Sequence, residues 1–178
     1  MAIVILLKVT LSNDPITSVD SLLWLHFVTL LIHQFEEYVY PGGFKTFFQE
    51  NIYNKNPIIR FPLNDRGIIL VNVVLGWTAY LVSAIYGMEK LWLAIGLLGV
   101  TILNGFMHTL MFVLKRKYNP GFYSGLFLMI PFGIFVLFKI QASISISQGK
   151  HGLIIFLIAV ALIPISIFVT NQFQGKNT

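Results

Sequence analysis

The sequence predicts an all-α protein, a polytopic transmembrane helical bundle with about five membrane-spanning helices. Hydrophobic residues make up 56% of the 178 residues, charged residues make up only 11%, and the mean hydropathy is +0.79. This composition lies outside the range of ordinary soluble domains. Five apolar stretches approach the roughly 20 residues that a helix needs to cross about 30 Å of hydrocarbon. Because these stretches fill most of the chain, we predict one membrane domain over residues 1–178.

The apolar stretches and the breaks between them divide the chain. Residues 1–14 are largely apolar but too short to span a membrane, and we expect an interfacial tail. Asn13, Asp14 and Pro15 supply a helix start, because a side-chain oxygen can cap free amides and proline suits a first turn. The first predicted span begins at residue 15 or 19 and ends at residue 40. The other four cover 67–87, 91–114, 121–140 and 152–170, and a C-terminal tail follows at 171–178.

A polar connection follows the first predicted span. Pro41, Gly42 and Gly43 end that helix, since proline cannot continue the backbone hydrogen bonds and glycine admits unusual backbone angles. Residues 41–66 then mix aromatic and basic side chains, which is typical of amphipathic segments in the lipid headgroup layer. We expect this connection to cover the opening of any site beneath it.

The net charge of +5 arises from basic residues in short loops beside apolar segments. There they set topology and contact the headgroups of membrane lipids, so the sequence does not predict nucleic-acid binding. Cytoplasmic loops carry the excess of Lys and Arg, which places the N-terminus outside and the C-terminus in the cytoplasm. One side holds Lys45, Lys55, Arg60, Arg66, Lys115, Arg116, Lys117 and Lys176, and the other holds Lys8, Lys90, Lys139 and Lys150.

Three ionisable residues lie within five positions at the end of the first predicted span. These are His33, Glu36 and Glu37, at spacings of three and four that bring them onto one helical face. An ionisable side chain at membrane depth is costly unless it is paired, hydrated or bound to a metal. The cluster is therefore the candidate functional centre.

Two other spans place polar residues at the same depth. His33 and His108 lie seven and six residues before the ends of the first and third spans, about 10 Å from the same membrane surface at 1.5 Å per residue. Asn104 is one turn from His108. The second span runs the opposite way, so Asn72, five residues into it, falls at a similar depth. We expect these residues to share one polar layer near the basic side.

This set of residues favours metal chemistry. There is no cysteine, so a metal needs His, Glu, Asp or Asn ligands. Imidazole and carboxylate suit zinc, iron or manganese, and we predict a divalent metal held by His33, His108 and one of the two glutamates, Glu36 or Glu37. Three protein ligands leave a position for a water molecule, which the metal activates. The remaining glutamate could act as general base, and Asn104 could donate to an oxyanion or support a ligand.

Two functions follow from the same centre. The first is a membrane-embedded hydrolase for a lipid-like substrate, either metal-assisted or based on a Glu–Glu pair that shares a proton. Its predicted catalytic residues are His33, Glu36, Glu37, Asn104 and His108. The alternative is a proton- or metal-ion-coupled carrier that uses the same site. Carriers usually have internal repeats and broken helices near the membrane midplane, whereas this cluster is off-centre and the sequence shows no convincing repeat, so the pattern favours the enzyme.

Three motifs occur in order: His33-x-x-Glu36-Glu37, Asn104-x-x-x-His108 and Tyr118-x-Pro120-Gly121. Together they resemble the HXXEE family of membrane proteins over roughly residues 22–165. The resemblance implies an uncharacterised membrane protein, whose polar motifs have suggested an enzyme. A looser likeness links the paired glutamates, with His and Asn on other helices, to the intramembrane glutamate proteases of the CAAX-processing type. The arginine that follows the glutamates in those proteases is replaced by Pro41.

The other polar residues divide into substrate-contacting and structural candidates. Tyr118 lies on the same side as the cluster, and we predict that it contacts substrate together with Asn72, although Asn72 also suits helix packing. Pro120 and Gly121 shape the turn into the fourth span. His26, one or two turns deeper in the first span, and His151, on the opposite side, are predicted to be structural.

Overall fold

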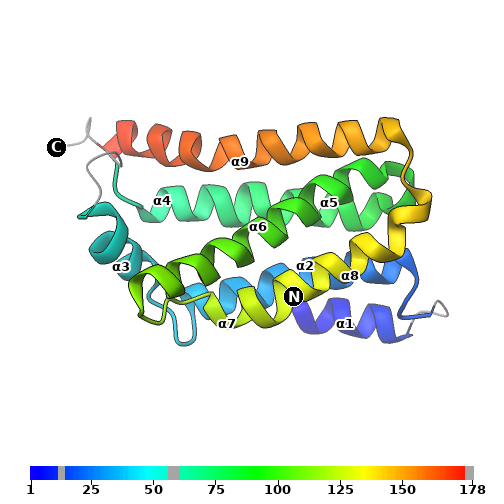
Figure 1. The fold of residues 1–178 in the computed structure, drawn as a ribbon, viewed down its shortest axis with the longest axis horizontal. Coiled ribbons are helices and arrows are strands. Elements are labelled where there is room, and N and C mark those ends of the chain that lie inside the picture. The colour runs from blue at the N-terminus through cyan, green and yellow to red at the C-terminus, as the bar shows by residue number, and fades with distance from the viewer. Residues whose placement is uncertain (12–14, 56–60, 175–178) are drawn as a thin grey trace.

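The computed structural model describes residues 1–11, 15–55 and 61–174, and every regular element in these ranges is helical. This confirms the predicted all-α class. In the described ranges the elements form five long helical rods that lie alongside one another, with the shorter helices α1 and α3 at the edge and at one end (Figure 1). The rods are α2 (Val19–Tyr38), α4–η2–α5 (Asp65–Ile68, Ile69–Trp77, Thr78–Tyr86), α6 (Leu91–Lys115), α7–η4–α8 (Phe122–Ser124, Gly125–Met129, Ile130–Ile140) and α9 (Ile146–Gln174). The shorter elements are α1 (Ala2–Leu11), α3 (Phe44–Phe48) with η1 (Gln49–Tyr53), and the turns η3 (Gly87–Lys90) and η5 (Gln141–Ser143).

Side-chain caps fix where two of the rods begin. The Ser18 hydroxyl accepts the amide of Ser21 at 3.2 Å, so α2 starts at Val19. The proposed helix-starting residues Asn13 and Asp14 lie outside the described residues. In the second rod, Asn64 Oδ1 accepts the Gly67 amide at 2.8 Å.

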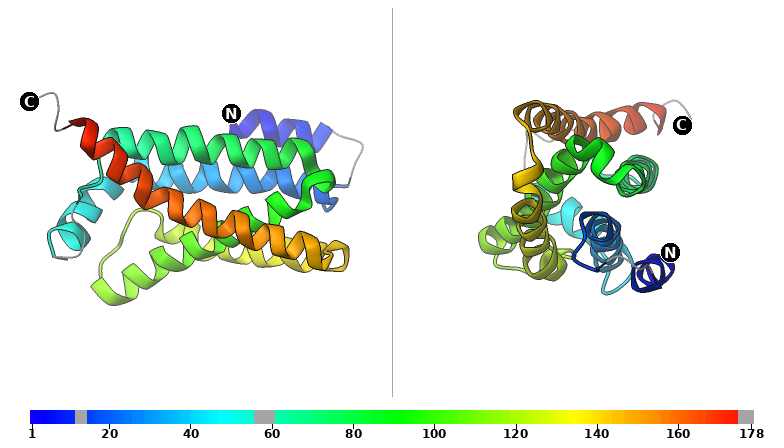
Figure 2. Two further views of the ribbon diagram at one scale, coloured as in Figure 1. Left: turned by 90° about the horizontal axis from the view of Figure 1, so that it is seen from above. Right: turned by 90° about the vertical axis from the view of Figure 1, so that its right-hand side faces the viewer.

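The N-terminal segment is a helix where we expected a tail. Helix α1 packs along α2 (Figure 2), and Val9 of α1 is buried. The predicted outside position of the N-terminus requires residues 1–11 to stay out of the membrane. Packing of α1 beside α2 does not test this requirement, so the orientation of the N-terminus stays a prediction.

Apolar packing is concentrated around α2 in the half of the bundle away from the polar layer. One cluster joins α2 to α6 and α8, and a second joins α2 to α5 and α6. In lipid, helices associate through close packing rather than through removal of apolar surface from water. These contacts hold α2 in the middle of the bundle. The buried members are Leu22, Leu23, Leu91, Ala94, Leu98, Val136 and Ile140 in the first cluster, and Phe27, Val28, Leu30, Tyr80 and Leu97 in the second.

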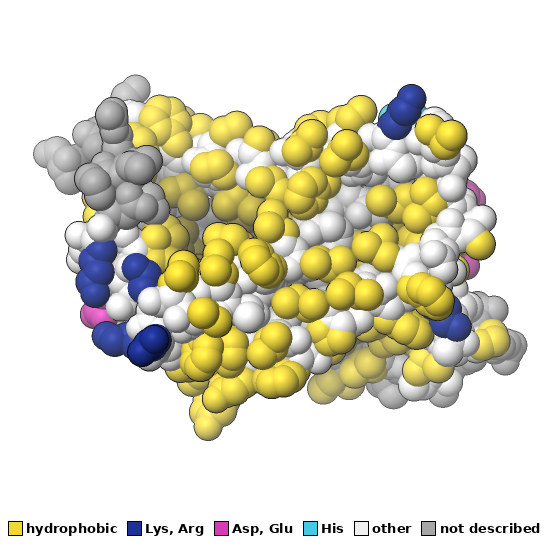
Figure 3. Space-filling view, in the orientation of Figure 1, with side chains coloured by type: hydrophobic (Ala, Val, Ile, Leu, Met, Phe, Trp, Pro, Cys, Tyr) yellow, Lys and Arg dark blue, Asp and Glu magenta, His cyan; other side chains and the backbone are white. Residues whose placement is uncertain are grey.

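Three helical segments of the described chain are long and apolar enough to cross a membrane. They are Asp65–Lys115, Phe122–Ser143 and Ile146–Phe173, and the first of them contains two rods joined by the turn η3. The rod α2, which carries the three ionisable residues, is not among them. Hydrophobic side chains cover the middle of the molecule, with Lys and Arg gathered at its two ends (Figure 3).

The two ends differ in charge, as the loop pattern predicts. By the helix bounds, the end where α2 and α6 finish carries Lys45, Lys55, Arg66, Lys115, Arg116 and Lys117, whereas the opposite end carries Lys90, Lys139 and Lys150. Arg60 and Lys176 lie outside the described residues. At the more basic end, Lys45 pairs with Asp65 at 2.7 Å and links α3 to the start of α4.

Candidate functional site

Close helix packing brings α6, the third rod in chain order, against α7–η4–α8, the fourth rod, beside α2. A Cβ added to Gly105 would lie 2.6 Å from the Gly125 carbonyl oxygen, so only glycine permits this crossing. His108, three residues after Gly105, therefore lies against the start of the fourth rod. The imidazole rings of His33 and His108 meet edge to face, with centroids 4.8 Å apart. The predicted match in depth between these two residues is confirmed.

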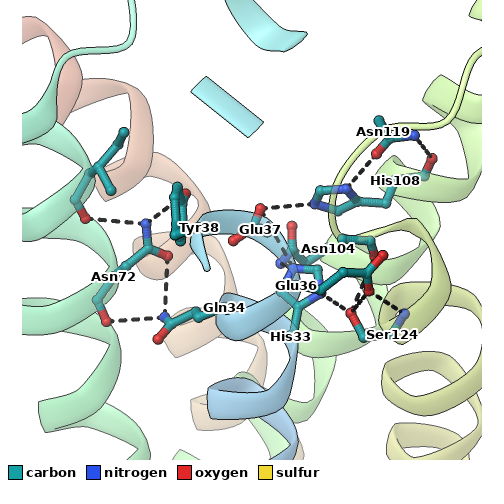
Figure 4. Close-up of polar contacts among 12 residues, drawn as sticks. His33, Gln34, Glu36, Glu37, Tyr38, Asn72, Asn104, His108, Asn119 and Ser124 are labelled. Atoms are coloured by element: carbon teal, nitrogen blue, oxygen red, sulfur yellow. Dashed lines mark hydrogen bonds and ion pairs between the residues drawn. The ribbon is translucent and has the colours of Figure 1, made fainter. Parts of the chain in front are cut away.

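Three potential metal ligands converge between α2 and α6 (Figure 4). Glu37 Oε1 lies 3.2 Å from His108 Nε2 and 3.7 Å from His33 Nε2, and ligand atoms of the three residues lie within 4.8 Å of one another. His33, Glu37 and His108 are only 0%, 4% and 1% exposed. Two ligands about 2.1 Å from a tetrahedral metal lie about 3.4 Å apart. The group could therefore hold a single metal ion.

Asn119 binds His108 Nδ1, the ring nitrogen that does not contact Glu37. Asn119 Nδ2 donates to the backbone carbonyl of His108 at 3.0 Å, which turns Asn119 Oδ1 toward His108 Nδ1 at 2.6 Å. An amide oxygen only accepts hydrogen bonds, so His108 carries its hydrogen on Nδ1. In the neutral ring, Nε2 then presents a lone pair to Glu37.

His33 is held in the same tautomer by a different partner. The Ser124 hydroxyl donates to Glu36 Oε2 at 2.5 Å, and its oxygen lies 2.9 Å from His33 Nδ1. Since that hydroxyl hydrogen is committed to the carboxylate, His33 Nδ1 donates to the Ser124 oxygen. His33 Nε2 is then the acceptor nitrogen of the ring, and it lies 3.7 Å from the same Glu37 oxygen that contacts His108.

Acceptor atoms lie close together in this centre. His108 Nε2 and Glu37 Oε1 are 3.2 Å apart, and His33 Nε2, which accepts a hydrogen bond from Asn104 Nδ2 at 2.9 Å, lies 3.7 Å from the same carboxylate oxygen. A proton or a metal ion between His108 Nε2 and Glu37 Oε1 would relieve the repulsion between these two acceptors. Metal-binding histidines characteristically donate their other N–H to an oxygen acceptor, as both do here.

Glu36 and Glu37 have separate environments. The Glu36 carboxylate accepts four hydrogen bonds, from the Tyr118 hydroxyl at 2.8 Å, the Tyr123 amide at 3.0 Å, and the Ser124 amide and hydroxyl at 2.6 and 2.5 Å. It caps the start of the fourth rod, where free amides and the helix dipole favour an anion. Glu36 therefore lies outside the His33, Glu37 and His108 group with which we predicted it would bind a metal.

The Tyr118-x-Pro120-Gly121 turn supports the centre from outside. Burial and the hydrogen bond to Glu36 raise the pKa of the Tyr118 hydroxyl, which stays protonated and serves as a donor. Gly121 has a φ of 98°, and a Cβ there would lie 2.5 Å from His108 Cε1 and 2.8 Å from His33 Cε1. Both imidazole rings thus occupy the space that a side chain at 121 would need.

Asn72 lies at the predicted depth but on another side of α2. Its Nδ2 donates to the Tyr38 hydroxyl at 3.1 Å, while Gln34 Nε2 donates to its Oδ1 at 3.3 Å (Figure 4). Trp77 Nε1 donates to Gln34 Oε1 at 2.6 Å. This second polar cluster joins α2 to η2. The substrate-binding roles of Asn72 and Tyr118 stay predictions, and both residues have structural partners.

Asn104 contacts the centre directly. Its Nδ2 lies 2.9 Å from His33 Nε2, and the residue is half-buried. Above the centre, the Phe44 ring of α3 lies 5.2 Å from the ring of His108. Phe44 belongs to the 41–66 connection, and the covering of the site by that connection as a whole stays a prediction.

The two histidines predicted to be structural lie elsewhere. His26 Nε2 lies 2.7 Å from Thr101 Oγ1, which is 2.6 Å from the Tyr80 hydroxyl, in a buried network between α2, α5 and α6. His151 is exposed near the start of α9.

A comparison with known protein families shows to which family this chain belongs. The family described as a protein of unknown function with HXXEE motif matches residues 24–136. The chain belongs to the HXXEE family. The matched range includes every residue of the centre and its support, from His33 to Ser124. No curated protein and no solved structure matches this HXXEE protein.

The sequence reasoning missed two residues that orient the histidines. Asn119 is the unmarked position within the Tyr118-x-Pro120-Gly121 motif of the family, and Ser124 follows three residues after that motif. A polar residue next to a proline is typical of a turn, so its type gives no indication of a role in the site. Their contacts depend on how the turn folds back onto α6, for which spacing along one helix gives no signal.

Proposed function

We propose that this HXXEE protein is a membrane-embedded enzyme that binds one divalent metal ion at His33, Glu37 and His108. The observation that supports the metal most strongly is the convergence of the acceptor Nε2 atoms of His33 and His108 on one Glu37 carboxylate oxygen, with both Nδ1 hydrogens donated to other partners. Two imidazoles and one carboxylate form a ligand set used by catalytic zinc and non-haem iron sites. α2 then acts as a fifth span, surrounded by the more apolar rods.

The proposed reaction is hydrolysis of a lipid-like substrate. A metal with three protein ligands activates a bound water molecule near neutral pH. The centre lies near the ends of α2 and α6, at the more basic end of the bundle, which we assign to the cytoplasmic side. A substrate reaching it from the bilayer would carry apolar chains, and an anionic headgroup would suit the surrounding Lys and Arg.

Metal analysis of purified protein tests the proposal. Wild type, prepared without chelators, should hold about one metal per chain by inductively coupled plasma mass spectrometry. His108→Ala and Glu37→Gln should lose it, while His151→Ala, which removes an exposed histidine, should retain it. Absence of metal from folded wild type after incubation with zinc, iron and manganese salts would contradict the proposal.

Activity measurements separate the enzyme from the carrier. Metal-loaded protein in micelles should hydrolyse at least one member of a panel of fatty-acyl esters and phospholipids, and His108→Ala should not. The carrier shares the metal site but predicts metal flux into proteoliposomes that depends on Glu37. Flux without hydrolysis would favour the carrier over the enzyme.

A further inference from the structure

Asn104 is distinguished from the other asparagines of the polar layer by an unused amide oxygen. Asn119 and Asn72 each have both ends of the side-chain amide in hydrogen bonds. Asn104 uses only Nδ2, and no hydrogen bond joins its Oδ1 to any residue that the structure describes. The two ends of an amide are nearly the same size, so a half-turn of this side chain would sacrifice only the bond to His33.

Metal binding would break that bond. The Asn104 amide donates to His33 Nε2, which is the atom that the proposed metal needs. Once the lone pair is given to a cation, an N–H pointing at it becomes repulsive. The half-turn replaces the N–H with a carbonyl oxygen at the same place, 2.9 Å from His33 Nε2. That separation matches two ligands at right angles about 2.1 Å from one metal, which lie about 3.0 Å apart.

We propose that Asn104 is a fourth protein ligand, whose amide turns from hydrogen-bond donor to metal ligand through Oδ1 when the metal binds. The inference rests on the proposed metal site. It makes the ligand set two imidazole nitrogens, one carboxylate oxygen and one amide oxygen. Because carbonyl oxygens suit hard cations such as manganese, Asn104 contributes more to Mn²⁺ binding than to Zn²⁺ binding.

Competitive titration of purified protein with Mn²⁺ and Zn²⁺ tests the fourth ligand. Asn104→Ala should weaken Mn²⁺ binding by about tenfold or more and Zn²⁺ binding by less. Asn104→Asp, which keeps an oxygen at this place, should preserve Mn²⁺ binding. The control is Asn171→Ala, because Asn171 is a half-buried asparagine of α9 whose amide donates to Pro62 and Ile167 backbone carbonyls. It should bind both metals like wild type.

The visible spectrum of bound Co²⁺ gives a second readout that a purely structural role would not change. Loss of a ligand alters the coordination number, so the d–d bands of Asn104→Ala should differ from those of wild type, whereas those of Asn171→Ala should not. Equal affinities within about twofold, with an unchanged Co²⁺ spectrum in Asn104→Ala, would overturn the fourth ligand while leaving the three-ligand site intact. Failure of wild type to bind any metal would overturn both.

Discussion

Replacing Glu36 by glutamine should destabilise the fold far more than it impairs metal binding. Glu36 accepts four hydrogen bonds from Tyr118, Tyr123 and Ser124, and it is only 8% exposed. Hydrogen bonds to a charged group contribute about 1.5–3 kcal/mol each. Glutamine keeps one acceptor oxygen and turns an N–H group toward donors, so about two of the four bonds are lost. We expect a loss of about 3–5 kcal/mol in the free energy of unfolding.

The assay is thermal unfolding in detergent, followed by the fluorescence of the three tryptophans. For a chain of this size, about 3–5 kcal/mol corresponds to a decrease of about 6–20 °C in Tm. The variant should still bind metal, with affinity reduced about tenfold because Ser124 loses the carboxylate that orients it toward His33. Glu37→Gln is the matched comparison, and it should lose the metal with little change in the Tm of the metal-free protein.

The opposite pattern would refute the distinction between the two glutamates. If Glu36→Gln abolished metal binding and left Tm unchanged, Glu36 would be a ligand rather than the cap of the fourth rod. If Glu37→Gln lowered Tm in the metal-free protein as much as Glu36→Gln, both carboxylates would be structural.

Three further substitutions probe the surroundings of the metal group. Asn119→Leu should weaken metal binding about 10- to 100-fold, because His108 loses the acceptor that fixes its tautomer, and competitive titration measures this change. Gly121→Ala should prevent folding or metal binding, since its Cβ would overlap both imidazoles, whereas Gly43→Ala, at a similar positive φ but with open space around it, should cost only about 1 kcal/mol in thermal unfolding. Phe44→Ala should speed metal release to a chelator several-fold in stopped-flow measurements, because Phe44 covers His108, and an unchanged release rate would contradict that covering role.

The sequence could predict what depends on position along a helix. The rise per residue is fixed, so counting from the helix ends placed His33, His108 and Asn72 at one depth, and the structure agrees. The limits of the first four rods followed within a few residues from proline, glycine and polar breaks, but the fifth prediction of 152–170 was too short, because α9 covers Ile146–Gln174 and includes part of the predicted link and tail. The helical form of residues 2–11 did not, because a short apolar segment gains its helix from packing on α2 rather than from its own length.

Rotation about each helix axis could not be predicted in the same way. Glu36 and Glu37 are adjacent, about 100° apart around α2, and spacing alone assigns both to one face. Packing against the fourth rod separates their side chains. Glu36 accepts hydrogen bonds from the backbone amides of residues 123 and 124, whereas Glu37 contacts the histidines. Asn72 shares their depth but approaches α2 from the side of η2, where Gln34 and Tyr38 bind it.

X-ray absorption spectroscopy of the zinc-loaded protein tests the central claim most directly. The account predicts a first shell of nitrogen and oxygen at about 2.0–2.1 Å, with the outer-shell scattering of two imidazoles. Substituting His108 by alanine should reduce this to one imidazole or abolish specific zinc binding, and substituting His151 should change nothing. A wild-type spectrum without imidazole scattering, or one that persists unchanged in His108→Ala, would contradict a metal centre at His33, Glu37 and His108.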